Sequence, residues 1–185
     1  MSDEEFYSSL ASGVEKLVDE DGDSGYRLNP PASETELVAL ERAIPHSIPA
    51  QLALALKHAN GEPSFDNPQG ILGGDYWLST EALVEQFQFH EVQLVHSFGD
   101  DASVWQDCNR VKQGKLWREE WLPISWGYDG RVLMIDTDPP SEGKLGQILL
   151  AEHIDRRFGV VANSLRELLE YSLSCKDRVS SWPLL

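Results

Sequence analysis

The chain has 185 residues, of which 41% are hydrophobic, so it can bury a core of its own, and one domain is the expected number at this length. Its 31 acidic and 15 basic residues give a formal net charge of −16 at pH 7. This charge repels nucleic acid and anionic membranes and favours a basic protein as partner. We therefore expect no nucleic-acid or membrane partner.

Targeting and redox signals are weak. No apolar run approaches the roughly 20 residues of a membrane span, and the N-terminus, MSDEEFYSSL, is acidic where a signal peptide is basic and then apolar. A cytoplasmic protein is expected. Cys108 and Cys175 lie far apart without a partner motif, so we expect reduced thiols rather than a disulfide or a metal site.

The acidic excess is concentrated in two blocks. Residues 1–25 carry eight acidic residues and one basic residue, and residues 63–110 carry the same numbers. A solubilising surface is one explanation of such blocks, and a site for a basic partner is the alternative that charge alone leaves open.

Two helix starts are marked by reciprocal capping boxes. Ser2 and Glu5 begin a helix expected over about residues 3–20, which is followed by a polar connection. Ser33 and Glu36 have the same spacing and begin a second helix. In a capping box each side chain accepts a hydrogen bond from a backbone N–H of the other residue, so both helix starts are predicted locally.

Proline and glycine mark the next boundaries. Pro45 ends the second helix because it offers no N–H, and Pro49 suits the first turn of a third. Asn60-Gly61 tolerates left-handed backbone and is expected to cap the C-terminus of that third helix. The glycine-rich segment GILGGDYWL predicts tight backbone packing that leads into a short strand.

A fourth helix and an irregular insert complete the first part of the chain. The helix has an apolar stripe on its inner face, carried by Leu83, Phe87, Leu94 and Phe98 with a polar gap at Glu91. Residues 99–120 show no clear period and are expected to be irregular.

From Trp121 the apolar period changes. The runs WLPISW, RVLMID, LGQILLA and RFGVVA are short and mostly separated by turn signals, which predicts an antiparallel meander. Ser164 and Glu167 then start a final helix, whose expected core residues are Leu165, Leu168, Leu169 and Leu173. The expected fold class is therefore α+β: a single domain with N-terminal helices, a mainly antiparallel sheet and a C-terminal helix.

The search for catalytic motifs finds only one candidate. No nucleophile elbow, zinc-protease motif, paired CxxC or phosphate loop is present, and the five histidines lack ligand spacing. Asp136 and Asp138 form a DxD after an apolar strand, which could hold a divalent cation for a metal-dependent transferase. We favour a plain turn into Pro139-Pro140, because no nucleotide-binding βαβ unit precedes it. We therefore expect no catalytic residue, metal or cofactor.

Six segments, in this order, resemble the SUKH superfamily, which includes the yeast cell-wall-assembly regulator of the Smi/Knr type and bacterial immunity proteins. They are LNPPASETELVALERAI, IPAQLALALKHANGEP, GILGGDYWLSTEALVEQF, WLPISWGYDGRVLMIDTDPP, GKLGQILLAEHID and VVANSLRELLEYS. We accordingly expect an N-terminal helix and acidic connection over residues 1–25, a SUKH-like domain over residues 26–175 and a tail over residues 176–185.

The resemblance implies a binding protein without enzymatic activity. Family members in bacteria typically neutralise a polymorphic toxin by direct binding, so an immunity protein with a basic toxin domain as partner is expected. A regulatory interaction scaffold without a toxin is the alternative.

Residues at strand ends and loops provide the candidate partner site. Aromatic anchors carry most of the binding energy of an interface, and charged residues form its rim. The candidates are Asp75, Tyr76, Trp77, Trp126, Asp129, Arg131 and Asp136. The alternative for Trp77 and Trp126 is a place in the core.

Overall fold

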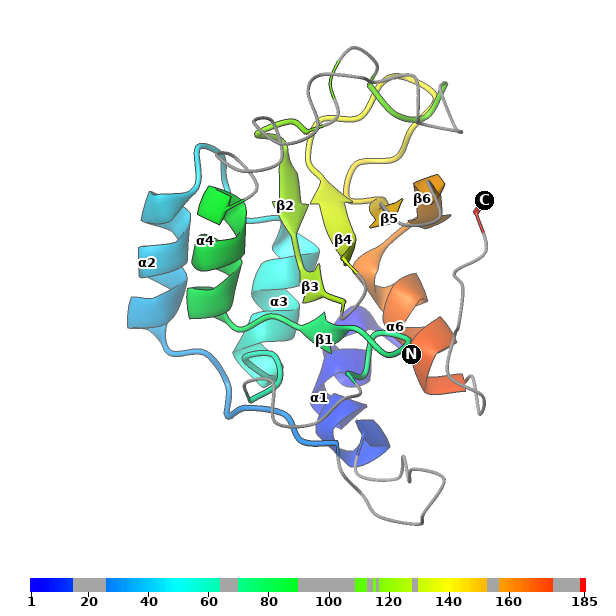
Figure 1. Cartoon of the computed structure of the whole chain (residues 1–185). Helices are drawn as coiled ribbons and strands as arrows, with labels where there is room; N and C mark the ends of the chain where they lie inside the picture. Colours follow the sequence, from blue (N-terminus) through cyan, green and yellow to red (C-terminus); the bar gives the residue numbers. More distant parts are fainter. Residues whose placement is uncertain are drawn as a thin grey trace.

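The computed structural model describes residues 1–14, 26–63, 70–89, 109–112, 115, 117–127, 130–152, 157–174 and 184–185. The helices in this part of the chain are α1 (Asp3–Val14), α2 (Glu34–Ala43), α3 (Ala50–His58), α4 (Thr80–Phe89) and α6 (Leu165–Ser174). The strands are β1 (Tyr76–Trp77), β2 (Trp121–Pro123), β3 (Ser125–Trp126), β4 (Arg131–Asp136), β5 (Ile148–Glu152) and β6 (Arg157–Ala162). The predicted α+β class, with helices first and last, is confirmed (Figure 1).

The two N-terminal capping boxes form as predicted. The Ser2 N–H donates to the Glu5 carboxylate at 2.7 Å, and the Glu5 N–H donates to Ser2 Oγ at 3.2 Å. The Ser33 N–H donates to the Glu36 carboxylate at 2.7 Å, and the Glu36 N–H donates to Ser33 Oγ at 3.3 Å. The part of the first predicted helix beyond residue 14 lies outside the described residues.

The cap of α6 differs in one bond from the prediction. The Glu167 N–H donates to Ser164 Oγ at 3.1 Å, as expected. The Glu167 carboxylate, however, accepts from the N–H of Asn163 at 2.9 Å and not from that of Ser164. Both bonds still satisfy donors at the helix start, so the boundary is as predicted.

The predicted role of Gly61 as a helix cap is wrong. Ala59, with extended backbone, ends α3 and donates its N–H to the carbonyl of Ala55. Gly61 does have a positive φ of 66°, but a Cβ there would lie 2.5 Å from the carbonyl carbon of Leu78. Glycine is therefore required where the loop after α3 passes close to the chain that follows β1.

The main sheet is antiparallel with the order β2-β4-β5-β6, which confirms the predicted meander. Residue pairs such as Leu122↔Ile135, Leu133↔Leu150 and Leu149↔Val160 set its register. β5 is buried along its whole length. A separate two-stranded ribbon pairs β1 with β3, so the run WLPISW serves both the sheet and the ribbon.

The helices form two groups around the strands. α2 and α4 contact each other on the left of Figure 1, and α4 also contacts β2. α1, α3 and α6 contact one another, and α6 also contacts β6. The buried apolar residues of both groups and of the sheet belong to one continuous core. This core provides the rigid support on which surface residues are positioned.

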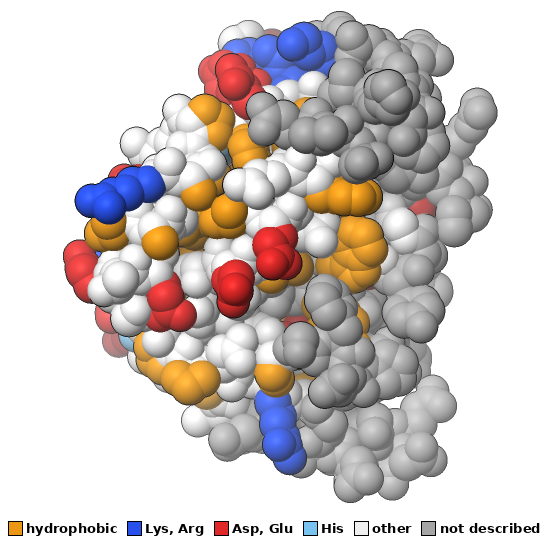
Figure 2. All heavy atoms as spheres, turned by 60° about the vertical axis from the view of Figure 1, so that its left-hand side comes forward, with side chains coloured by type: hydrophobic (Ala, Val, Ile, Leu, Met, Phe, Trp, Pro, Cys, Tyr) orange, Lys and Arg blue, Asp and Glu red, His pale blue; other side chains and the backbone are white. Residues whose placement is uncertain are grey.

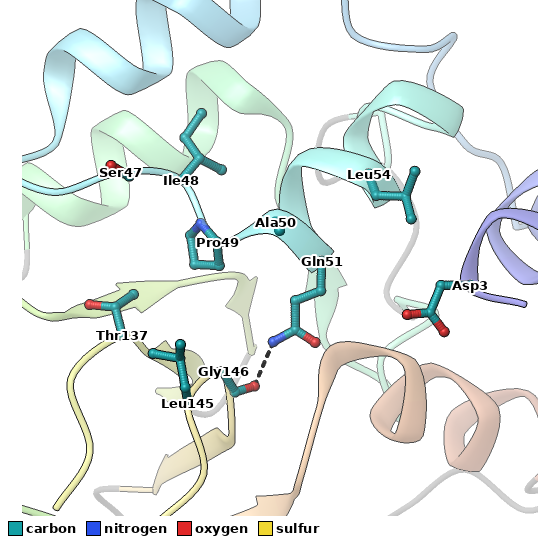
Figure 3. A pocket seen from close by; sticks show the side chains of 10 residues that line it. All are labelled: Asp3, Ser47, Ile48, Pro49, Ala50, Gln51, Leu54, Thr137, Leu145 and Gly146. Atoms are coloured by element: carbon teal, nitrogen blue, oxygen red, sulfur yellow. Dashed lines mark hydrogen bonds between the residues drawn. The ribbon is translucent and has the colours of Figure 1, made fainter.

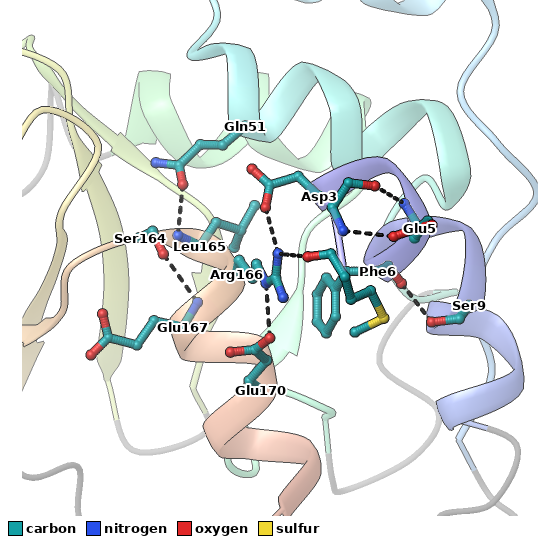
Figure 4. A network of polar contacts seen from close by, with 12 residues as sticks. Asp3, Glu5, Phe6, Ser9, Gln51, Ser164, Leu165, Arg166, Glu167 and Glu170 are labelled. Carbon is teal, nitrogen blue, oxygen red and sulfur yellow. Dashed lines mark hydrogen bonds and ion pairs between the residues drawn. The ribbon is translucent and has the colours of Figure 1, made fainter.

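Arg166 on α6 holds the first turn of α1 (Figure 4). Its guanidinium lies 2.8 Å from the Asp3 carboxylate and 3.0 Å from the Met1 carbonyl oxygen, and it pairs with Glu170 at 2.8 Å. It also lies 5.2 Å from the centre of the Phe6 ring. Exposed ion pairs contribute little to stability, so the buried apolar face of α1 is the larger contribution to its docking.

Candidate protein-binding surface

The β1–β3 ribbon brings together candidates that are distant in sequence. Tyr76 pairs with Trp126 and Trp77 pairs with Ser125 in antiparallel register. The Arg131 carbonyl oxygen accepts the N–H of Gly127 just after β3, so the start of β4 lies beside the ribbon. β1, the end of the run WLPISW and Arg131 therefore lie beside one another.

A buried ion pair supports this ribbon. Arg131 lies 3.1 Å from Oδ1 of Asp75, and their side chains are 11% and 0% exposed. A Cβ on residue 127 would lie 2.7 Å from the same Asp75 oxygen, so Gly127 leaves the space that the carboxylate occupies. Asp75, expected at the rim, is buried instead, because its charge is compensated inside the protein by Arg131.

Trp77 belongs to the core. Its side chain is only 1% exposed and lies within the continuous apolar cluster. The structure therefore supports the alternative for this residue, a place in the core. A partner could touch Trp77 only after local unfolding. Tyr76 is also largely buried, whereas Trp126 is partly exposed and packs against the core.

Phe89 joins Trp126 to form an exposed aromatic pair that sequence reasoning missed. The two ring centres are 6.2 Å apart, with an interplanar angle of 78°, and the Phe89 side chain is 46% exposed. Edge-to-face geometry of this kind is favourable for aromatic rings. The sequence did contain a signal for this exposure. On α4, Phe89 lies off the inner apolar stripe of Leu83 and Phe87.

Asp136 lies at the other end of β4 and acts in a turn. It is fully buried and accepts hydrogen bonds from Gln147 Nε2 at 3.0 Å and from the Asp138 N–H at 3.1 Å. Burial raises the pKa of Asp136 despite these donors. The Asp138 carboxylate forms an ion pair with the Lys112 ammonium. The expectation that Asp136 belongs to the partner surface does not fit its burial, and Asp129 lies outside the described residues.

The donor set at this turn does not fit a cation site. Each oxygen of the Asp136 carboxylate accepts a hydrogen bond from the protein, and Asp138 is already paired with a cationic side chain. Among the described residues, no group of three or more His, Cys, Asp or Glu side chains is placed to hold a metal ion. The geometry is that of an Asp that initiates a turn.

Glu62 is a second buried carboxyl group that the sequence did not single out. It accepts hydrogen bonds from the N–H groups of Ile71, at 3.1 Å, and Trp77, at 2.8 Å. Burial nevertheless raises the pKa of Glu62 to about 8. These bonds fasten the glycine-rich turn and β1 to the loop after α3, so Glu62 positions the ribbon from the inside.

A cavity of about 550 Å³ lies at the start of α3 (Figure 3). Ile48, Pro49, Leu54 and Leu145 make much of its lining apolar. The Gln51 amide, which points into this region, donates to the Gly146 carbonyl at 2.7 Å and accepts from the Leu165 N–H at 2.8 Å. Asp3, which also lines the cavity, is paired with Arg166. Since the polar groups of Gln51 and Asp3 are already engaged, the cavity offers mainly apolar contact.

The face that carries α2 and α4 combines acidic and hydrophobic side chains. Figure 2 shows acidic groups near the centre of this face, among hydrophobic ones. Glu81, Glu85 and Phe89 follow one another at intervals of four along α4, so they lie close to one line on its surface. Much of the two acidic blocks, including residues 15–25 and 90–108, lies outside the described residues.

Together these features define an α+β domain with an exposed aromatic pair beside an acidic helical face. The sequence matches the SMI1/KNR4 family (SUKH-1) over residues 31–171, and the chain belongs to that family. This confirms the resemblance found in the sequence. Comparison with curated proteins gives no significant match. No helix in the described ranges is long and apolar enough to cross a membrane.

Proposed function

We propose that this SUKH-1 family protein is a protein-binding module without enzymatic activity, and that it neutralises a toxin by covering it. The observation that carries the proposal is the Phe89–Trp126 pair, which exposes apolar ring surface at the edge of a well-packed domain. Aromatic side chains held in this way are typical centres of protein interfaces.

The surroundings of the pair favour binding without rearrangement. Trp126 is held by its pairing with Tyr76, and the ribbon is fastened by the buried Asp75–Arg131 pair and by Glu62. A rigid anchor loses little conformational entropy when a partner binds. The net charge of −16 adds steering of a basic partner, which raises the association rate more than the final affinity.

The test begins with isolation of the partner from the native cell by pull-down with the full chain. The affinity of the purified partner is then measured for Phe89→Ala and Trp126→Ala. Truncation of a central anchor costs about 2 kcal/mol or more, which corresponds to a roughly thirtyfold weaker affinity. Tyr171→Ala is the matched control, because Tyr171 is an aromatic residue of α6 with 39% exposure.

The nature of the partner decides the role. A toxin whose activity is lost in the complex supports neutralisation, whereas a partner without toxic activity supports the regulatory scaffold. Equal effects of the Phe89, Trp126 and Tyr171 variants would refute the location of the interface. The transferase built on Asp136 and Asp138 gains no support, because the Asp136 carboxylate is hydrogen-bonded within the turn and the Asp138 carboxylate is paired with Lys112.

A further inference from the structure

A groove of about 380 Å³ runs between α2 and α4. Its apolar lining consists of Ala39, Leu40, Ala43 and Val84. Three carboxylates, those of Glu36, Glu81 and Glu85, also line it, and no Lys or Arg in the described part of the chain does. The groove therefore combines an apolar base with a negative border.

The negative charge of the groove is not neutralised by the part of the chain that is described. The carboxylates of Glu81 and Glu85 make no side-chain hydrogen bond or ion pair with any described residue. They lie four positions apart on α4, where like charges repel. Glu36 stays ionised, because hydrogen bonds from Ser33 lower its pKa. A cationic partner would relieve this repulsion, whereas an anionic one would increase it.

The dimensions of the groove suit a helix. α2 and α4 have ten residues each and are therefore about 15 Å long. Two adjacent helices leave a groove into which the side-chain ridge of a third helix packs. The long aliphatic stems of Lys and Arg can cover small apolar residues such as Ala39 and Ala43 while their charged ends reach carboxylates.

We propose that the α2–α4 groove receives a basic amphipathic helix of the partner protein, an inference that rests on the proposed binding function. Lys or Arg side chains of that helix pair with Glu81 and Glu85, and its apolar positions contact Val84 and the two alanines. The aromatic pair lies close to the groove along α4, because Phe89 follows Glu85 by one turn on the same face of the helix. One partner can therefore cover both features.

The direct test uses a defined probe and the full chain. The probe is a fluorescent synthetic peptide of about 15 residues, long enough to form a helix, with Lys on one face and Leu and Ala on the other. Its affinity is measured by anisotropy at low and physiological salt. A second peptide with Glu in place of every Lys reports binding that does not depend on the positive charge.

Two pairs of variants separate the groove from general attraction to an acidic protein. Glu81→Lys should weaken probe binding by about fivefold or more. Glu142→Lys, the same charge change in the turn between β4 and β5, should weaken it less than about twofold. Ala39→Gln places a polar side chain in the groove, whereas Val38→Gln changes the neighbouring residue of α2 that does not line it. Only the former should weaken binding.

The proposal would be overturned if the two variants of either pair lost the same amount of affinity for the probe, or if the Lys and Glu peptides bound equally well. Thermal unfolding of each variant verifies that the fold is retained. The natural partner then distinguishes the two proposals. If Phe89→Ala weakens binding of the natural partner but Glu81→Lys and Ala39→Gln do not, only the groove inference fails. If the probe peptides bind as expected but Phe89→Ala does not change the affinity for the natural partner, the proposed interface at the aromatic pair fails and the groove inference stands.

Discussion

Replacement of Glu62 by Gln should remove a large part of the pH dependence of folding. The pKa of Glu62 is about 8 in the folded protein, against a usual value of 4.5, because the carboxyl group is buried. Between these values the folded state holds a proton that the unfolded state has lost. The free energy of unfolding therefore falls as pH rises through this window and stops falling above about pH 8.

The magnitude follows from the size of the pKa difference. One pKa unit corresponds to about 1.4 kcal/mol, so the whole window amounts to a loss on the order of 5 kcal/mol. The Gln side chain is neutral at every pH, and its carbonyl oxygen can still accept from the N–H groups of Ile71 and Trp77. We expect Glu62→Gln to gain stability relative to the wild type as pH rises from 5 to 8.

Urea unfolding followed by tryptophan fluorescence at pH values from 5 to 9 measures this difference. Glu85→Gln is the control, because it is the same substitution at an exposed carboxylate of α4. The reasoning would be refuted if the curves of free energy against pH for the wild type and Glu62→Gln ran parallel over the whole window.

Three further outcomes test the assignments of core and surface. Trp77→Ala should lower the free energy of unfolding by about 3–5 kcal/mol in urea, whereas Phe89→Ala should lower it far less; similar losses would contradict the placement of Trp77 in the core. Arg131→Ala should cost about 3 kcal/mol because it leaves the Asp75 carboxylate buried and uncompensated, and an unchanged urea midpoint would argue against the ion pair. Titration of Mn²⁺ or Mg²⁺ should leave the melting temperature of chelator-treated protein unchanged, and a saturable rise that Asp136→Ala abolishes would restore the metal hypothesis.

Local signals predicted the helix starts correctly. The Ser33–Glu36 box depends on side chains three residues apart, so its hydrogen bonds require no information from the rest of the chain. The short apolar runs and the turn signals of the later segments were likewise sufficient for an antiparallel meander. The family followed from the order of these local segments, because that order is itself a property of the sequence.

Contacts between distant segments decided the roles of individual residues. Gly61 was read as a helix cap, but its conformation is required by the close approach of Leu78. Asp75 and Trp77 were candidates for the partner surface because they lie at strand ends and loops, with a place in the core as the alternative for Trp77. In the structure, Arg131 pairs with Asp75 and the core encloses Trp77. Burial depends on what packs against a residue, and no local pattern specifies that neighbour.

The candidate binding surface likewise depends in part on local sequence and in part on contacts between distant segments. The order of residues is enough to show that the chain is strongly acidic and that aromatic and charged residues occur beside its short strands. Which of these residues form a surface depends on the fold, because β1 and β3 are about 50 residues apart and meet by strand pairing. The same packing leaves Phe89 beside Trp126 and opens the groove between α2 and α4, since both depend on how whole elements are placed against one core.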